Sequence, residues 1–328
     1  MKKILITGIA GFIGFHLAKK LVEKKYMIIG IDNLNNYYDK KLKKNRVKIL
    51  GKKIIFHKID ITNFESANKI FKKYRPDIVI NLAAQPGVRY SLKNPKAYIS
   101  SNIVGFFNII ELSKIYKIKQ FLYASSSSVY GLEKVLPFSE NMKANSPASL
   151  YGATKKSNEL IAHSYSYLHN LSTIGLRYFT VFGPWGRPDM AIFKFVKNII
   201  KNKKIVVYNN GNMTRDFTYI DDAVNITYKL ITYKKKRNIK TTKNLVPSKV
   251  VNIANSKPTN IKKFISILEK NLNKKSNIVF KNNIKTEIKN TKGDTKQLHK
   301  ITNIEKFTSL EEGIKKFIQW YKNYYLLK

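Results

Sequence analysis

The sequence predicts an α/β fold, in which a doubly wound parallel sheet is followed by a smaller C-terminal α/β domain. Short apolar runs of strand length alternate with helical patterns over the first 180 residues, and uninterrupted apolar strands are typical of parallel sheets covered by helices on both faces. A turn with three glycines separates the first apolar run from the first helical pattern. The chain of 328 residues is long enough for about two domains.

Each element is predicted from its own hydrophobic period. Strands are expected at residues 3–7, 27–31, 54–59, 78–81, 120–124, 173–179, 205–208 and 250–253. Helices are expected at residues 15–24, 67–74, 96–116, 151–170, 192–202, 221–233 and 310–325. The regular alternation ends near Phe182, where a second domain is expected to begin. Residues 234–249 contain a run of four basic residues and are expected to form an exposed loop.

The composition excludes several kinds of site. Cysteine is absent, which rules out disulfides, thiolate metal sites, iron–sulfur clusters and a cysteine nucleophile. The five histidines show no ligand spacing, so no metal site is expected. An uncharged run at residues 4–18 follows two lysines as in a signal peptide, but glycines interrupt it and it is too short to span a bilayer. We therefore expect a cytoplasmic protein that does not insert into a membrane.

A cofactor site is predicted at the glycine turn. Residues 7–14 read TGIAGFIG, and their glycines let backbone N–H groups approach a pyrophosphate where a helix begins. The second predicted strand ends in Asp32, eighteen residues after Gly14, where a carboxylate accepts hydrogen bonds from ribose hydroxyls. This carboxylate would repel a 2′-phosphate, so the expected cofactor is NAD rather than NADP. Residues 1–180 with 217–256 are predicted to form an NAD-binding Rossmann-type domain, and residues 181–216 with 257–328 a substrate domain.

A reactive tyrosine is predicted on the helix at 151–170. Tyr151 and Lys155 are four residues apart and therefore share one face of that helix. A phenol with a pKa of about 10 is a weak base at neutral pH, and a nearby ammonium would lower this pKa. Four serines at 125–128 close the preceding strand. Their alternative interpretation is a polar loop without a chemical role.

With these motifs, the chain resembles the extended short-chain dehydrogenase/reductase family over nearly its whole length. The similarity includes DI at 60–61, NLAAQ at 81–85 and SSSSVYG at 125–131. It implies the catalytic residues Tyr151, Lys155 and Ser126, of which Ser126 is the hydroxyl partner of the tyrosine. It also implies a cofactor-binding set that consists of Gly8, Gly11, Phe12, Ile13, Gly14, Asp32, Asp60, Ile61, Ala83, Ala84, Gln85, Asn102, Tyr151 and Lys155.

Flanking segments are similar to UDP-glucuronate 4-epimerases of bacterial capsule and lipopolysaccharide biosynthesis. They read DNLNNYYD at 32–39, QPGVRYS at 85–91, LRYFTVFGPWGRPDM at 176–190 and RDFTYIDD at 215–222. Related 4,6-dehydratases carry an Asp-Glu pair where this chain has two serines, at 127 and 128, so the carboxylates needed for elimination are missing. The resemblance implies epimerisation of UDP-glucuronate to UDP-galacturonate through a transient 4-keto sugar. A UDP-glucose or UDP-N-acetylhexosamine 4-epimerase is the nearest alternative.

The same resemblance implies five substrate-binding residues in the UDP-sugar site. Ser127 and Thr180 would contact the sugar carboxylate, Arg187 and Arg215 would bind the diphosphate, and Arg89 would lie on the substrate side. One segment departs from the family pattern. Residues 285–287 read KTE where relatives carry a Pro-Gly-Asp turn near the nucleotide, so the role of Glu287 stays open.

The net charge of +42 raises the question of partners. Only seven of the 62 basic residues are arginine, whereas surfaces that bind phosphate often favour its planar fork. Lysine-rich composition of this kind is typical of A/T-rich codon usage, so no specific nucleic-acid partner is expected. A non-catalytic nucleic-acid-binding protein is the alternative from another class, and it predicts steeply salt-dependent binding to RNA. Relatives pair through the helices at 96–116 and 151–170, which implies a homodimer.

Overall fold

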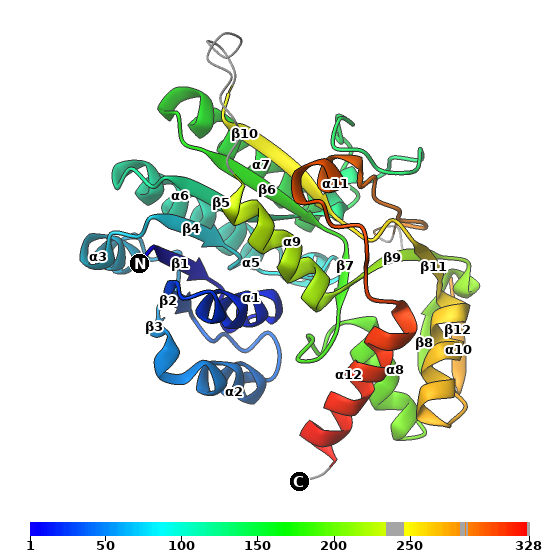
Figure 1. Ribbon diagram of the computed structural model, residues 1–328. Coiled ribbons are helices and arrows are strands. Elements are labelled where there is room, and N and C mark those ends of the chain that lie inside the picture. Colours follow the sequence, from blue (N-terminus) through cyan, green and yellow to red (C-terminus); the bar gives the residue numbers. More distant parts are fainter. Residues whose placement is uncertain (234–245, 283–285, 287, 327–328) are drawn as a thin grey trace.

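A sheet of seven parallel strands forms the larger part of the protein (Figure 1). The computed structural model describes residues 1–233, 246–282, 286 and 288–326. The strands run in the order β10-β6-β5-β4-β1-β2-β3. They are β1 (Lys3–Thr7), β2 (Met27–Asp32), β3 (Ile55–Lys58), β4 (Ile78–Asn81), β5 (Gln120–Ser126), β6 (Thr173–Tyr178) and β10 (Ser248–Ile253). The predicted fold class, a Rossmann-type doubly wound sheet with a smaller C-terminal α/β part, is confirmed.

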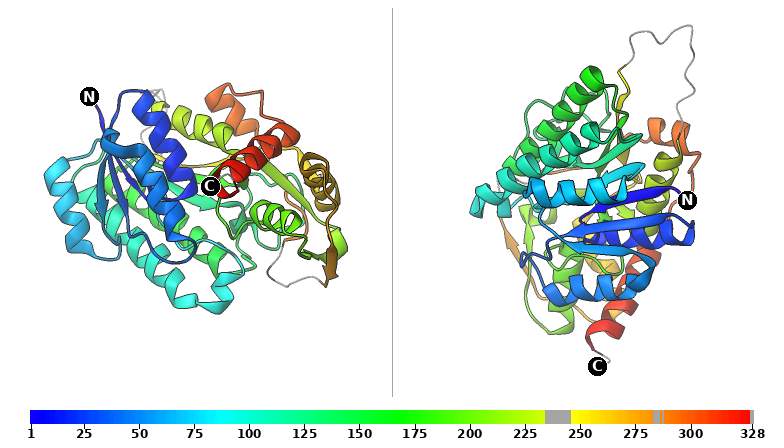
Figure 2. Two further views of the ribbon diagram at one scale, coloured as in Figure 1. Left: turned by 90° about the horizontal axis from the view of Figure 1, so that it is seen from below. Right: turned by 90° about the vertical axis from the view of Figure 1, so that its left-hand side faces the viewer.

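Helices cover both faces of this sheet (Figure 2). Successive strand residues point to opposite faces, so Leu5 and Ile29 contribute to one buried cluster and Ile4 and Ile28 to the other. The first cluster includes residues of α3 (Phe64–Tyr74), α6 (Gly105–Ile115) and α7 (Leu150–His169). The second includes residues of α1 (Phe12–Glu23) and α9 (Ile220–Thr232).

The C-terminal part has two small sheets and three longer helices. β9 (Thr214–Tyr219) pairs in parallel with β7 (Thr180–Phe182) and antiparallel with β11 (Pro258–Asn260). β8 (Ile205–Tyr208) pairs with β12 (Ile278–Lys281). The helices are α8 (Ala191–Ile200), α10 (Ile261–Leu272) and α12 (Leu310–Tyr325). Between β9 and β11 the chain returns to the large sheet through α9 and β10. The division into residues 1–180 with 217–256 and residues 181–216 with 257–328 stays a prediction.

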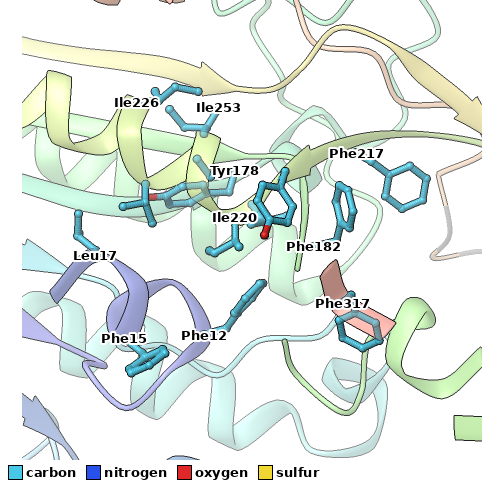
Figure 3. Packing of buried hydrophobic residues seen from close by; sticks show 14 of the residues in the cluster. Phe12, Phe15, Leu17, Tyr178, Phe182, Phe217, Ile220, Ile226, Ile253 and Phe317 are labelled. Atoms are coloured by element: carbon cyan, nitrogen blue, oxygen red, sulfur yellow. The ribbon is translucent and has the colours of Figure 1, made fainter. Parts of the chain in front are cut away.

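One hydrophobic core extends through both parts (Figure 3). Phe12 and Phe15 of α1 belong to the same buried cluster as Phe182 at the end of β7 and Phe317 of α12. The predicted amphipathic helix at 310–325 is α12, and its buried face carries Ile314, Phe317, Ile318 and Tyr321. The smaller part therefore packs directly against the helices of the large sheet.

Several elements differ from the prediction. The helix α2 (Lys40–Leu50) was not expected, because its sequence KKLKKNRVKIL is dominated by lysine. The helix expected at 96–116 consists of α5 (Pro95–Tyr98), a π-helical segment at Ile99–Val104 and α6. Short helices also form at α4 (Tyr90–Lys93) and α11 (Lys296–Thr302). Residues 234–245 of the expected loop lie outside the described residues. Within the described residues, no helix has the length and apolar content that crossing a membrane requires.

Candidate active site

A cavity of about 360 Å³ lies at the carboxyl edge of the large sheet. In the sheet, β1 lies between β2 and β4. The strands that follow β1 in sequence are first added on its β2 side and then on its β4 side, so the strand order reverses at β1. Doubly wound sheets bind their ligands at such a switch point. The C-terminal part contributes Thr180, Arg187 and Met190 to the lining. Within the described residues, no group of three or more His, Cys, Asp or Glu is placed to hold a metal ion.

The glycine turn forms one wall of the cavity. Gly8 has a φ of +71°, and a Cβ there would lie 2.7 Å from the backbone nitrogen of Ala83. A Cβ on Gly14 would lie 2.3 Å from the carbonyl oxygen of Gly8. Only glycine fits at these two positions, and the resulting tight turn brings the first turn of α1 to the cavity. Backbone amides at a helix N-terminus bind phosphate groups, so this wall fits the pyrophosphate of a dinucleotide.

Asp32 lies at the end of β2, where the sequence predicts a ribose contact. Its carboxylate accepts hydrogen bonds from the Ala10 amide at 3.1 Å and from the Leu34 amide at 2.8 Å. Burial raises the pKa of this carboxyl, although both amides and the nearby Lys43 and Arg46 charges oppose that shift. Each carboxylate oxygen can accept more than one hydrogen bond, so Asp32 retains capacity for ribose hydroxyls.

Twelve of the predicted cofactor-binding residues line the cavity, whereas Gln85 and Asn102 lie outside its described lining. The twelve are Gly8, Gly11, Phe12, Ile13, Gly14, Asp32, Asp60, Ile61, Ala83, Ala84, Tyr151 and Lys155. Asn102 Oδ1 accepts from the Gln85 amide at 2.7 Å, and Asn102 Nδ2 donates to the Gln85 carbonyl at 3.1 Å. Asn102 thus stabilises the loop after β4 through the backbone of Gln85, without lining the cavity itself.

Tyr151, Lys155 and Ser126 all line the cavity. Ser149 caps α7 by accepting a hydrogen bond from the Gly152 amide, which places Tyr151 in the first turn. Lys155 Nζ donates to the Ala124 carbonyl oxygen at 2.8 Å, so α7 is fixed against β5. The three predicted catalytic residues are therefore adjacent to the predicted cofactor wall.

Burial dominates the electrostatics of this trio. It raises the pKa of Tyr151, while the Arg187 charge and a hydrogen bond with Ser126 lower it. Burial also lowers the pKa of Lys155 to about 7. The sequence predicts that the Lys155 ammonium lowers the Tyr151 pKa, and this stays a prediction. In the structure the Arg187 charge, which comes from the C-terminal part, lowers it.

Arg187 lines the cavity, together with Ser127 and Thr180. Asp189 holds it through two hydrogen bonds, at 3.0 Å from Nε and 2.9 Å from Nη2. Tyr37 donates to the same carboxylate at 3.3 Å. Burial lowers the pKa of an arginine, but the Asp189 carboxylate outweighs it and raises the pKa of Arg187. This arrangement presents a charged guanidinium beside the reactive tyrosine.

The other two predicted substrate-binding arginines, Arg89 and Arg215, have their described contacts outside this cavity, and their role stays a prediction. The described lining of the cavity contains neither Arg89 nor Arg215. The Arg89 guanidinium lies 4.1 Å from the centre of the Tyr208 ring. Arg215 donates to the carbonyl oxygens of Thr214 at 2.9 Å and Lys289 at 3.0 Å. Lys285 and Glu287 lie outside the described residues.

Several lining residues were not assigned from the sequence. They include Asn33, Asn35, Tyr37, Tyr38, Lys43 and Met190. Residues 33–38 belong to a motif that carried the resemblance, so the motif could have identified them. Lys43 belongs to the unpredicted α2, and its Nζ donates to the Asn35 carbonyl oxygen at 3.0 Å. No sequence signal separates it from the chain's many other lysines.

Known proteins match this chain over nearly its full length. Residues 4–254 match the model of the NAD dependent epimerase/dehydratase family. Protein CapI of Staphylococcus aureus is 46% identical over 98% of this chain and 99% of its own length. A probable UDP-glucuronate 4-epimerase of Rhizobium meliloti is 39% identical over 98% of both chains. The UDP-glucuronic acid 4-epimerase of Bacillus cereus, crystallised with UDP-glucuronic acid and NAD, has a TM-score of 0.89 and 34% identity over 98% of this chain and 100% of its own.

Proposed function

The chain belongs to the NAD dependent epimerase/dehydratase family, and on this premise we propose that it interconverts UDP-glucuronate and UDP-galacturonate. The family membership confirms the NAD cofactor and the enzyme class that the sequence predicted. One observation carries the choice of reaction. The cavity brings Tyr151 together with the neutral hydroxyls of Ser126, Ser127 and Thr180, and residues 127–128 lack the Asp-Glu pair of dehydratases.

Tyr151 is the proposed acid–base residue. The chemistry that NAD supplies when bound is hydride transfer at C4 of the sugar. Tyr151 would take the proton of the 4-hydroxyl and return it after the sugar has turned over in the cavity. Ser126 would donate a hydrogen bond to the reacting oxygen, and Lys155 would bind the cofactor ribose. The reaction has no net redox change, so the cofactor is expected to stay bound through many turnovers.

Ser127 and Thr180 are proposed to hold the substrate carboxylate. A 4-keto derivative of glucuronate is a β-keto acid, which loses CO₂ when the breaking C–C bond aligns with the ketone π system. Hydroxyl donors fix the carboxylate out of this alignment and add no positive charge next to it. Arg187 is the described cavity residue that fits the diphosphate best, because a charged guanidinium forms paired hydrogen bonds to phosphate oxygens.

Product analysis tests the proposal. Purified protein is incubated with UDP-glucuronate, and the products are resolved by NMR. UDP-galacturonate without added cofactor is the expected product. Formation of a UDP-pentose with CO₂ would identify a decarboxylase. Turnover of UDP-glucose or a UDP-N-acetylhexosamine, with none of UDP-glucuronate, would favour the neutral-sugar alternative.

We also propose that the protein forms a homodimer through α6 and α7. These helices pack side by side, and Tyr165 on α7 donates to Glu111 on α6 at 2.7 Å. Large apolar residues stay exposed on both, including Phe107 at 46% and Leu160 at 61%. A second copy of the same pair would cover them by forming a four-helix interface.

A further inference from the structure

Arg46 on α2 is a fully buried arginine that joins two walls of the site. Its Nη1 donates to the Ala10 carbonyl oxygen at 2.7 Å and to the Tyr38 hydroxyl at 2.8 Å. Its Nη2 donates to the carbonyl oxygens of Trp185 at 2.6 Å and Gly186 at 3.4 Å. One guanidinium therefore spans from the glycine turn to the segment that leads into Arg187.

The three carbonyls before Arg187 are all held by side chains of the cofactor-binding part. Besides the two contacts of Arg46, His16 Nε2 lies 3.0 Å from the carbonyl oxygen of Pro184. Burial lowers the pKa of His16 to about 4, so at neutral pH the ring is uncharged and donates one N–H. The Trp185 ring packs against Phe15 with a centroid distance of 5.6 Å.

The backbone of Trp185 shows that these contacts impose a conformation. Its φ is +61°, in the left-handed region that a bulky side chain rarely adopts. Such a backbone persists only where surrounding contacts determine it. These contacts therefore hold the segment at 184–187 in one conformation. That conformation determines the backbone position from which the Arg187 side chain extends.

Burying Arg46 is costly, and packing does not explain it. Within the described residues, oxygen atoms of carbonyls and a hydroxyl surround its charge, with no carboxylate in direct contact, and its Nε has no hydrogen-bond partner. Asp32 is near enough for its pKa to be lowered by the Arg46 charge, but a buried charge with no carboxylate in contact is still unfavourable compared with an apolar residue of similar volume. Arg46 also lies outside the described lining of the cavity, so it does not touch the ligands itself.

We propose that Arg46 is a positioning residue that acts through Arg187. It fixes the segment at 184–187 against the glycine turn, so that the diphosphate-binding guanidinium keeps a set distance from the cofactor wall. The inference rests on the proposed function only in its use of Arg187 as the diphosphate contact. It predicts that Arg46 affects UDP binding without touching UDP.

A double-mutant cycle with Arg46→Lys and Arg187→Met tests this inference. Lysine keeps the charge, but a single ammonium cannot reach all the oxygens that the planar fork connects. UDP binding to the NAD-loaded protein is measured by calorimetry for the wild type, both single variants and the double variant. We expect Arg46→Lys to weaken UDP binding about tenfold in the wild-type background and less than twofold beside Arg187→Met.

Two results would overturn the inference. One is equal weakening by Arg46→Lys in both backgrounds, which indicates independent effects on structure. The other is unchanged UDP binding in folded Arg46→Lys or in Arg187→Met. If Arg46→Lys does not fold, His16→Ala replaces it, because among the hydrogen bonds to the carbonyls of 184–186 this change removes only the one to Pro184, and its smaller effect should also vanish beside Arg187→Met. Inactivity of the wild type on UDP-glucuronate would refute the proposed reaction while leaving the UDP cycle intact.

Discussion

Asp32 has two tasks at the residue scale, since it faces the cavity and also holds the amides of Ala10 and Leu34. Asp32→Ala removes both, and we expect NAD to bind about tenfold or more weakly, because hydrogen bonds to a charged group contribute about 1.5–3 kcal/mol. Asp32→Asn is the matched control, as its remaining oxygen still accepts from the backbone, so its loss of affinity should be smaller. Binding is measured by calorimetry on cofactor-free protein. Unchanged affinity in Asp32→Ala would remove Asp32 from the cofactor site.

Asp189 is expected to set the pH dependence of the reaction. Burial raises the pKa of Tyr151, Arg187 lowers it and Asp189 raises it. Asp189→Asn removes a charge that raises this pKa and leaves the Arg187 charge uncompensated, and both changes lower it. The acid limb of the kcat–pH profile should therefore move to lower pH, whereas Asp189→Glu should leave it nearly in place. A shift to higher pH would show that Asp189 acts on another group.

At the element scale, the π-helical segment at Ile99–Val104 connects the cofactor loop to α7. Asn102 in this segment bonds to both backbone groups of Gln85, and its Nδ2 also donates to Thr154 Oγ1 at 3.1 Å. Asn158 Nδ2 donates to the Asn102 carbonyl oxygen at 2.7 Å. A π-helical turn that carries such contacts is often found next to a functional site.

Asn102→Ala should therefore lower both stability and NAD affinity. It leaves the buried backbone groups of Gln85 unpaired, which costs about 1–3 kcal/mol per group. Asn102→Asp is the matched comparison, because its carboxylate can still accept from the Gln85 amide but sets a second, buried oxygen against the Gln85 carbonyl. We expect its unfolding free energy, measured with urea, to be no higher than that of Asn102→Ala. Wild-type stability and NAD affinity in Asn102→Ala would show that the loop after β4 does not need this support.

Short-range patterns predicted much of the sheet and the chemical motifs, but not the contacts between distant elements. The turn at 7–14, Asp32 and the Tyr151–Lys155 pair follow from local spacing, so the sequence identified them. The helix α2 was missed because lysine masks its apolar positions, and with it Lys43 and Arg46 were missed. The hydrophobic period of 3.6 residues that identifies an α-helix does not distinguish the π-helical segment at Ile99–Val104. The sequence therefore did not predict the contacts of Asn102 with the backbone of Gln85. Arg89 and Arg215 were chosen for residue type and family position, which do not determine where a side chain points.

At the scale of the whole molecule, the shared core explains why the two parts of the chain act on one cavity. The buried cluster continues from Ile4 in β1 to Phe317 in α12, and Arg187 reaches the tyrosine from the C-terminal part. The predicted division into two domains therefore does not imply two independently folding units. Side chains such as Arg46 connect the glycine turn of the large sheet to the segment at 184–187 of the C-terminal part. We infer that the position of Arg187 in the cavity depends on this connection.

The proposed dimer rests on the exposed apolar residues of α6 and α7. If these helices form the dimer interface, light scattering should give twice the chain mass of 38.0 kDa. The double variant Phe107→Asp with Leu160→Asp should give the monomer mass, because burying four unpaired carboxylates in a symmetric interface is strongly unfavourable. Val135→Asp is the matched control, since Val135 is 68% exposed but lies in the segment between β5 and α7, and it should leave the mass unchanged. A monomeric wild type at all concentrations would refute the dimer, and dissociation by Val135→Asp alone would move the interface to that segment.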